Sequence, residues 1–120
     1  MVSARRKAVE SLYKGLCTVK VQTSYKDPIT QITKQQEITL FSDEKCKLSF
    51  EKQVSTTPTN GPALIAQTTK LFIAPELDIP VGSKIIVTQH GKTMEYTRSG
   101  KPAIYMDHQE IMLEAFERYA

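Results

Sequence analysis

Side chains that could perform acid–base chemistry or bind a metal are few in this chain, and they do not cluster. There are two histidines, His90 and His108, and neither stands at metal-ligand spacing from a cysteine or from the other histidine. His90 precedes Gly91 in an expected tight turn, and His108 lies just before the last apolar segment. We expect structural or surface roles for both, with a turn-fixing hydrogen bond for His108.

The acidic residues and the glycines do not form a catalytic pattern either. A general acid–base pair needs burial or a charged neighbour that shifts a pKa, and the sequence indicates neither. The glycines lack the spacing of a phosphate-binding loop. The acidic residues are scattered over turns, a proline-bounded loop and the C-terminus: Asp43, Glu44, Glu76, Asp78, Glu114 and Glu117. We therefore expect no catalytic residue, no cofactor and no metal, and a small enzyme is the least favoured class.

Cys17 and Cys46 both stand in segments with alternating apolar residues. Two buried thiols are the favoured interpretation, because free cysteine is among the most buried residue types. A disulfide is the alternative, although two cysteines without a secretion signal do not make a disulfide framework. The basic N-terminus is not followed by an apolar signal region, and no apolar run is long enough to cross a bilayer. We expect a soluble protein made in a cytoplasm, without a membrane partner.

Length and charge predict one ordinary folded domain over residues 1–120. The chain has 120 residues and a net charge of +3. A chain of this length can bury its own core. The basic excess is too small to indicate nucleic-acid binding by itself.

Residues 1–15 are expected to hold the one good helix, from a cap at Ser3 to Lys14, with Gly15 ending it. An apolar stripe follows helical spacing and consists of Ala8, Val9, Leu12 and Tyr13. Three basic residues of the first turn lie mostly off that stripe: Arg5, Arg6 and Lys7. They are expected in solvent, and docking against an acidic partner surface is the alternative.

After Gly15 the apolar period changes from helical to two, as in half-buried strands. The expected strands are Cys17–Val21, Gln36–Phe41, Lys45–Glu51, Thr69–Ala74, Lys84–Gln89, Thr93–Arg98, Ala103–Met106 and Glu110–Phe116, although the last also fits a helical stripe. This spacing predicts a mainly β fold: a small antiparallel β-barrel or sandwich with one N-terminal α-helix and a long flexible loop. Its core is expected to contain Leu48, Phe50, Leu71, Ile73, Ile85, Val87 and Tyr96. Ile38 and Leu40 are expected to share a strand face, and Ser42-Asp43-Glu44 to form a turn.

The segment from Gln53 to Gln67 is expected to be that long loop. It contains two prolines and no charged residue, and it is longer than a strand connection usually needs. Leu64 and Ile65 would gain free energy if a partner buried them. The candidate subunit contacts are Pro58, Asn60, Gly61, Leu64 and Ile65, together with Arg5, Arg6 and Lys7. An insertion of no consequence is the alternative.

The stretch from Leu71 to Phe116 follows a further pattern of strands and turns. A hydrophobic strand ends in proline, a turn follows, and an apolar strand leads to Gly-x-x-x-x-Tyr, a Gly-x-Pro turn and His-x-Glu. The residues are Pro75, Asp78, Gly82, Ile85–Val87, Gly91, Tyr96, Gly100, Pro102, His108 and Glu110. This pattern resembles the C-terminal half of small head-completion and head–tail connector proteins, minor capsid proteins of tailed phages and prophages of Gram-positive bacteria. Ser83 departs from it, because an acidic residue often follows that glycine.

The resemblance implies a virion protein that forms a homo-oligomeric ring between portal and tail, present in the host cytoplasm before assembly and possible as a monomer in isolation. Its implied partners are portal or adaptor proteins and tail-side connector proteins, and DNA would pass through the ring without specific binding. No enzymatic residue is implied. The alternative function is a small OB-like domain that binds single-stranded nucleic acid, with strand aromatics such as Phe41 and Phe72 as the stacking platform.

Overall fold

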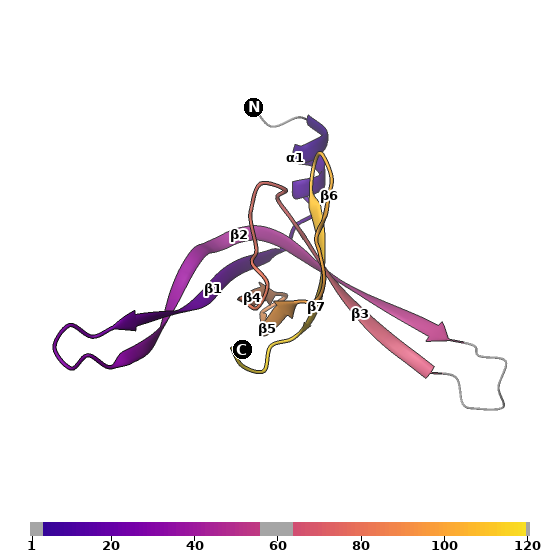
Figure 1. The fold of residues 1–120 in the computed structure, drawn as a ribbon. Helices are drawn as coiled ribbons and strands as arrows, with labels where there is room; N and C mark the ends of the chain where they lie inside the picture. Colours follow the sequence, from indigo (N-terminus) through magenta and orange to yellow (C-terminus); the bar gives the residue numbers. More distant parts are fainter. Residues whose placement is uncertain (1–3, 56–63, 120) are drawn as a thin grey trace.

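The computed structural model describes residues 4–55 and 64–119, with side chains described for 4–51 and 68–119. Figure 1 shows one short helix beside a sheet whose strands extend far beyond its centre. The elements are α1 (Ala4–Glu10), β1 (Gly15–Lys26), β2 (Thr33–Ser55), β3 (Leu64–Ile73), β4 (Lys84–Gln89), β5 (Lys92–Arg98), β6 (Ala103–Ile104) and β7 (Gln109–Ala115). The predicted mainly β fold with an N-terminal helix is confirmed. The helix is shorter than predicted, because it ends at Glu10.

The sheet closes on itself. Its strands follow the order β3-β2-β1-β4-β5-β7-β6, and β3 also pairs with β7. Every pairing is antiparallel. Six strands therefore form a small closed barrel, and β6 adds a short pairing at the start of β7. The ambiguous C-terminal segment is a strand, since β7 pairs with β3 on one side and with β5 and β6 on the other.

The core lies inside this barrel and contains most of the predicted residues. Leu48, Leu71, Ile73, Ile85, Val87 and Tyr96 are buried, as predicted, and Cys17, Val19, Cys46, Ile79, Ile111 and Leu113 join them. Phe50 was predicted there wrongly, because it is 46% exposed. It pairs with Thr69, the first residue of β3 that pairs with β7. Beyond this position β2 and β3 leave the barrel, and no strand among the described residues faces them.

β2 corrects the prediction of two strands with a turn at Ser42-Asp43-Glu44. The strand runs on from Thr33 to Ser55, and its register against β1 shifts on both sides of Val19. Asp43 takes a positive φ of 54°, and its backbone N–H donates to Thr18 Oγ1 at 3.4 Å. The expected turn is therefore a β-bulge, which bends the strand and lets it continue. The same residue types that favour a turn also tolerate this conformation.

Two connections, the β4–β5 turn and the loop after β3, are held in defined conformations, and the sequence predicts turns in both. His90 and Gly91 have φ values of 54° and 75°, which fits a tight two-residue hairpin turn between β4 and β5. The loop after β3 is fixed by the buried Gln109, whose Nε2 donates to the carbonyls of Ala74 at 2.8 Å and Leu77 at 2.6 Å. These bonds hold Ile79 in place as a core residue that the strand pattern does not predict.

Candidate functional site

β1 and β2 continue beyond the barrel as a hairpin, which Figure 1 shows as a projection at the indigo and violet end of the molecule. β4 pairs with β1 only from Leu16 to Lys20, and β3 pairs with β2 only from Cys46 onward. We call residues 21–40 the first arm. The radius of gyration is 17.8 Å, against about 14 Å expected for a compact chain of this length. The projecting first arm contributes to this extended shape.

The first arm exposes apolar side chains along its length. Val21 pairs with Ile38, and Tyr25 lies on the same face because side chains alternate along a strand. The exposed fractions are 44% for Tyr25, 90% for Ile29, 59% for Ile32, 39% for Ile38 and 45% for Leu40. Ile38 and Leu40, which are expected to share a strand face, are therefore both exposed to solvent. A lone two-stranded hairpin is marginal in water, and gathered exposed apolar residues mark an interaction surface.

The tip of the first arm is a defined turn. The Asp27 carboxylate accepts hydrogen bonds from the backbone N–H groups of Ile29 at 2.8 Å and Thr30 at 3.3 Å, and Lys34 lies 3.4 Å from it. Those backbone bonds are the main reason that the pKa of Asp27 is lowered. The Asp27 N–H also donates to the Ile32 carbonyl at 3.0 Å. This network presents Ile29 and Ile32 to solvent at the end of the arm.

The base of the first arm is tied to the barrel and to the C-terminal tail. Lys84 Nζ donates to Glu37 Oε2 at 2.9 Å, and the Tyr119 hydroxyl donates to the same oxygen at 2.8 Å. The Lys84 bond is the largest cause that lowers the pKa of Glu37, to about 2. Burial, followed by the bond to Glu37, raises the pKa of Tyr119 to about 12. These contacts fix the direction in which the arm leaves the barrel.

A second arm is formed by residues 52–55 and 64–67, so the predicted loop is shorter than expected. The pairing of β2 with β3 continues through Val54 with Ile65 to Ser55 with Leu64, so both flanks of the segment Gln53–Gln67 are strand. Leu64 and Ile65 therefore belong to β3 and not to a loop tip. Pro58, Asn60 and Gly61 lie outside the described residues, and their contact role stays a prediction.

The three basic residues of the first helical turn are expected in solvent; Arg5 and Lys7 are exposed there, whereas the Arg6 side chain is only 18% exposed. Arg5 Nε lies 2.9 Å from Asp107 Oδ2, and Arg6 pairs with both Glu10 and Glu76. Lys7 is exposed. The helical stripe is only partly buried, because Tyr13 is 9% exposed whereas Leu12 is 62% exposed. Two of the three basic contact candidates thus hold α1 on its own chain.

His108 lies at the centre of a charged network on the same end. Its Nδ1 is 2.7 Å from Asp107 Oδ1 and its Nε2 is 2.9 Å from Glu110 Oε2. The ring stacks on Tyr105 at 4.8 Å and on Phe72 at 5.9 Å between centroids. Burial by itself would lower the pKa of His108, but the bonds to Glu110 and Asp107 outweigh it and raise that pKa. A protonated imidazole can donate to both carboxylates at once, whereas a neutral one can donate to only one.

We expect His108→Gln to lower the free energy of unfolding more at about pH 5.5 than at about pH 8.5. A group whose pKa is raised on folding stabilises the fold fully below its unfolded pKa, and that contribution fades as pH rises through the folded pKa. Denaturant unfolding of both proteins at each pH measures the difference. Met106→Ser, at a 98% exposed side chain that does not titrate, is the control and should have the same effect at both pH values. An equal cost of His108→Gln at both pH values would contradict the prediction.

The remaining predicted turn residues lie at the surface or in connections. Asp78 and Gly82 stand in the segment between β3 and β4, and Gly100 and Pro102 stand between β5 and β6. Gly82 and Gly100 adopt positive φ values of 82° and 103°. A Cβ at either position would meet no atom within 4 Å, so backbone conformation and not space explains these glycines.

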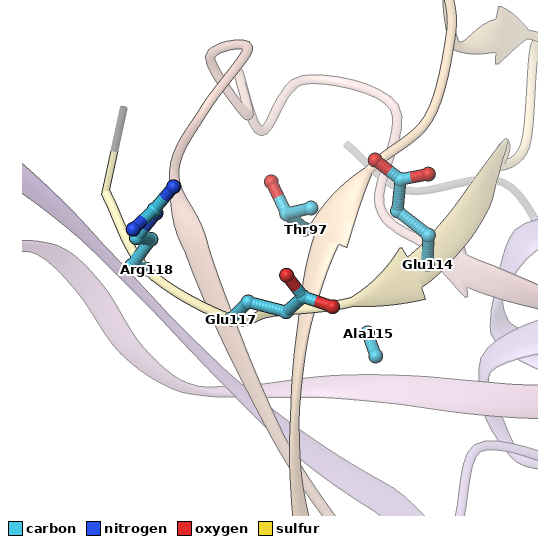
Figure 2. Close-up of a pocket in the computed structure, with 5 residues that line it drawn as sticks. All are labelled: Thr97, Glu114, Ala115, Glu117 and Arg118. Atoms are coloured by element: carbon cyan, nitrogen blue, oxygen red, sulfur yellow. The ribbon is translucent and has the colours of Figure 1, made fainter.

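A surface hollow of about 580 Å³ lies where β5 and β7 meet the C-terminal tail. Figure 2 shows its lining, with Thr97 and the Glu117 carboxylate between Glu114 on one side and Arg118 on the other. The lining also includes Ala115. It contains no histidine or cysteine, so it offers no thiol or imidazole as a nucleophile or proton acceptor near neutral pH.

Other reactive groups of the described chain are buried or dispersed. Cys17 and Cys46 are both free and fully buried, as the favoured interpretation predicted. Their mutual hydrogen bond and then burial raise the pKa of the Cys17 thiol, which suppresses the reactive thiolate. Residues 4–55 and 64–119 contain no group of three or more His, Cys, Asp or Glu side chains placed to hold a metal ion.

No described helix is long and apolar enough to cross a membrane.

Comparisons with known proteins give one finding. No protein-family model matches the chain, and no curated protein matches it. Among solved structures, the phage-like element PBSX protein xkdH from Bacillus subtilis is similar, with 14% sequence identity and a TM-score of 0.49. The alignment covers 82% of this chain and 90% of that chain.

Proposed function

We propose that this protein is a structural subunit of a phage or prophage particle, a head-completion or head–tail connector subunit that forms a ring between portal and tail. The observation that carries the proposal is the first arm. It leaves the barrel, pairs with no strand other than its own two among the described residues, and exposes apolar side chains from Tyr25 to Leu40. Such a surface is costly in an isolated molecule and useful in an assembly.

The architecture suits a ring subunit. A ring is built from heterologous contacts, in which each copy presents two different surfaces to its two neighbours. A rigid barrel supplies the body, and the two arms supply surfaces that lie away from it (Figure 1). The pattern of turns and strands from Leu71 to Phe116, which resembles connector proteins, adds to this case. Portal or adaptor proteins and tail-side connectors are the proposed partners, and the virion is the proposed location.

The aromatic residues favour this function over the OB-like alternative. Phe41 is packed against the core and is only partly accessible. Phe72 is stacked on His108, and Lys47 lies over its ring at 6.0 Å from the centroid. A stacking platform for bases needs open ring faces, and these two rings already have neighbours. We therefore propose no nucleic-acid site.

Electron microscopy of particles tests the proposal directly. Two kinds of particle from the host that makes this chain would be imaged. In one the protein is tagged, and in the other its gene is deleted. We expect added density at the portal vertex in the tagged particles, and unfinished heads without tails in the deletion. Density elsewhere in the particle, or normal tailed particles without the protein, would contradict the proposal.

A further inference from the structure

The two strands of the first arm have open edges on opposite sides of the same ribbon. Pairing of β4 with β1 stops at Lys20, and Tyr119 lines a hollow with Val21 and Gln22, so the free edge of β1 runs from Thr23 to Lys26. The outer edge of β2 pairs with no described strand from Thr33 to Lys45. An open strand edge presents unpaired N–H and C=O groups and is a template for another strand.

The charges of these two strands are opposite. The open part of β1, from Thr23 to Lys26, contains Lys26 and no acidic residue, which gives +1. The open part of β2, from Thr33 to Lys45, contains two lysines and three acidic residues, Glu37, Asp43 and Glu44, which gives −1. Two β1 edges would repel each other, and so would two β2 edges. The β2 edge of one molecule attracts the β1 edge of another.

The geometry points to a second copy of this chain as the occupant of each edge. We infer that the β2 edge of one first arm pairs with the β1 edge of the next, so that the arms of successive copies form one continuous antiparallel ribbon. The strands of a single arm are already antiparallel, and the added strand would continue the same alternation. The apolar face of each arm would then join the apolar face of the neighbouring arm. Val21, Tyr25 and Ile38 would repeat along the combined ribbon.

This inference rests on the proposed ring in one respect: an edge contact of two unlike strands is heterologous and closes only by rotation. It adds to the ring the surface through which the copies bind each other. It also excludes a two-fold dimer through the arms, because that arrangement places equal edges together.

Directed cross-linking tests the inference. Ser24→Cys puts a thiol on β1 of the arm, and Gln35→Cys puts one on β2, on the same face, because these residues pair within a copy. Each variant would be treated with a short bismaleimide by itself. A mixture of the two untreated variants would then be treated in the same way. The native Cys17 and Cys46 are fully buried and should not react. We expect covalent dimers in the mixture at least tenfold more abundant than in either variant alone.

The outcomes separate the inference from the proposed function. Dimers that form within one variant alone would indicate a two-fold contact and overturn the inference. Equally, no dimer in a mixture that light scattering shows to be oligomeric would overturn it, while the ring function would stand. Dimers in solution from a protein absent from particles would support the edge contact and overturn the proposed function. Lys26→Glu, which reverses the charge at the edge of β1, should lower the dimer yield, whereas Lys26→Arg should preserve it.

Discussion

Excision of the first arm should leave a folded barrel that no longer assembles. The variant replaces residues 23–36 by Asn-Gly, so that Gln22 and Glu37, which pair in the native hairpin, flank a two-residue turn. No residue of that segment belongs to the core. Glu37 also keeps its bonds to Lys84 and Tyr119. We therefore expect a melting temperature close to that of the native protein.

The loss should appear in assembly and nowhere else. Sedimentation of the purified variant should show monomer at concentrations where the native protein associates, and complementation of a deletion should yield no finished particles. A matched pair of point variants separates the arm from exposure in general. Ile29→Ser changes a side chain that is 90% exposed on the arm, and Met106→Ser changes one that is 98% exposed near the helix. Only the first should reduce assembly, and finished particles at normal titre from the excision variant would refute the arm's role.

The sequence predicts the barrel better than it predicts the arms, and the reason is physical. Alternation shows that a strand has an apolar side, but whether that side is buried depends on another strand lying over it. Leu48 and Phe50 follow the same alternation, yet only Leu48 is covered. Ile38 and Leu40 also alternate in the sequence, and both are exposed, because the strands that would have to cover them stop short. These exposed apolar residues lie where β2 extends past its barrel neighbours.

The sequence could not predict contacts between residues far apart in the chain, and the reason is different. Arg5 meets Asp107 and Arg6 meets Glu76 because α1 lies beside the connections that follow β3 and β6. No local pattern contains that placement. The partial exception is His108, whose neighbours Asp107 and Glu110 are close in sequence. The sequence predicted a turn-fixing hydrogen bond for His108 without naming its partner, and the structure places both carboxylates on its ring.

The largest effect on stability should come from Ile85→Ala. Ile85 is fully buried and lies between Val19 on β1 and Tyr96 on β5, so its side chain joins three adjacent strands. Removing a buried aliphatic side chain of this size costs about 2–5 kcal/mol, because burial is lost and a cavity remains. Urea or thermal unfolding measures the loss. Because the neighbouring Ile86 points to the other side of the sheet and is partly exposed, Ile86→Ala is the matched control.

The pair tests the register of β4 as well as the size of the effect. A shift by one residue would exchange the two sides of the strand and bury Ile86 in place of Ile85. We expect Ile86→Ala to cost clearly less than Ile85→Ala, and Ile29→Ala on the arm to change stability by no more than about 0.5 kcal/mol. A larger cost for Ile86→Ala would show that β4 is paired one residue away from its positions against β1 and β5. In that case Val19 and Tyr96 would face different partners, and the barrel from which the first arm projects would be built differently.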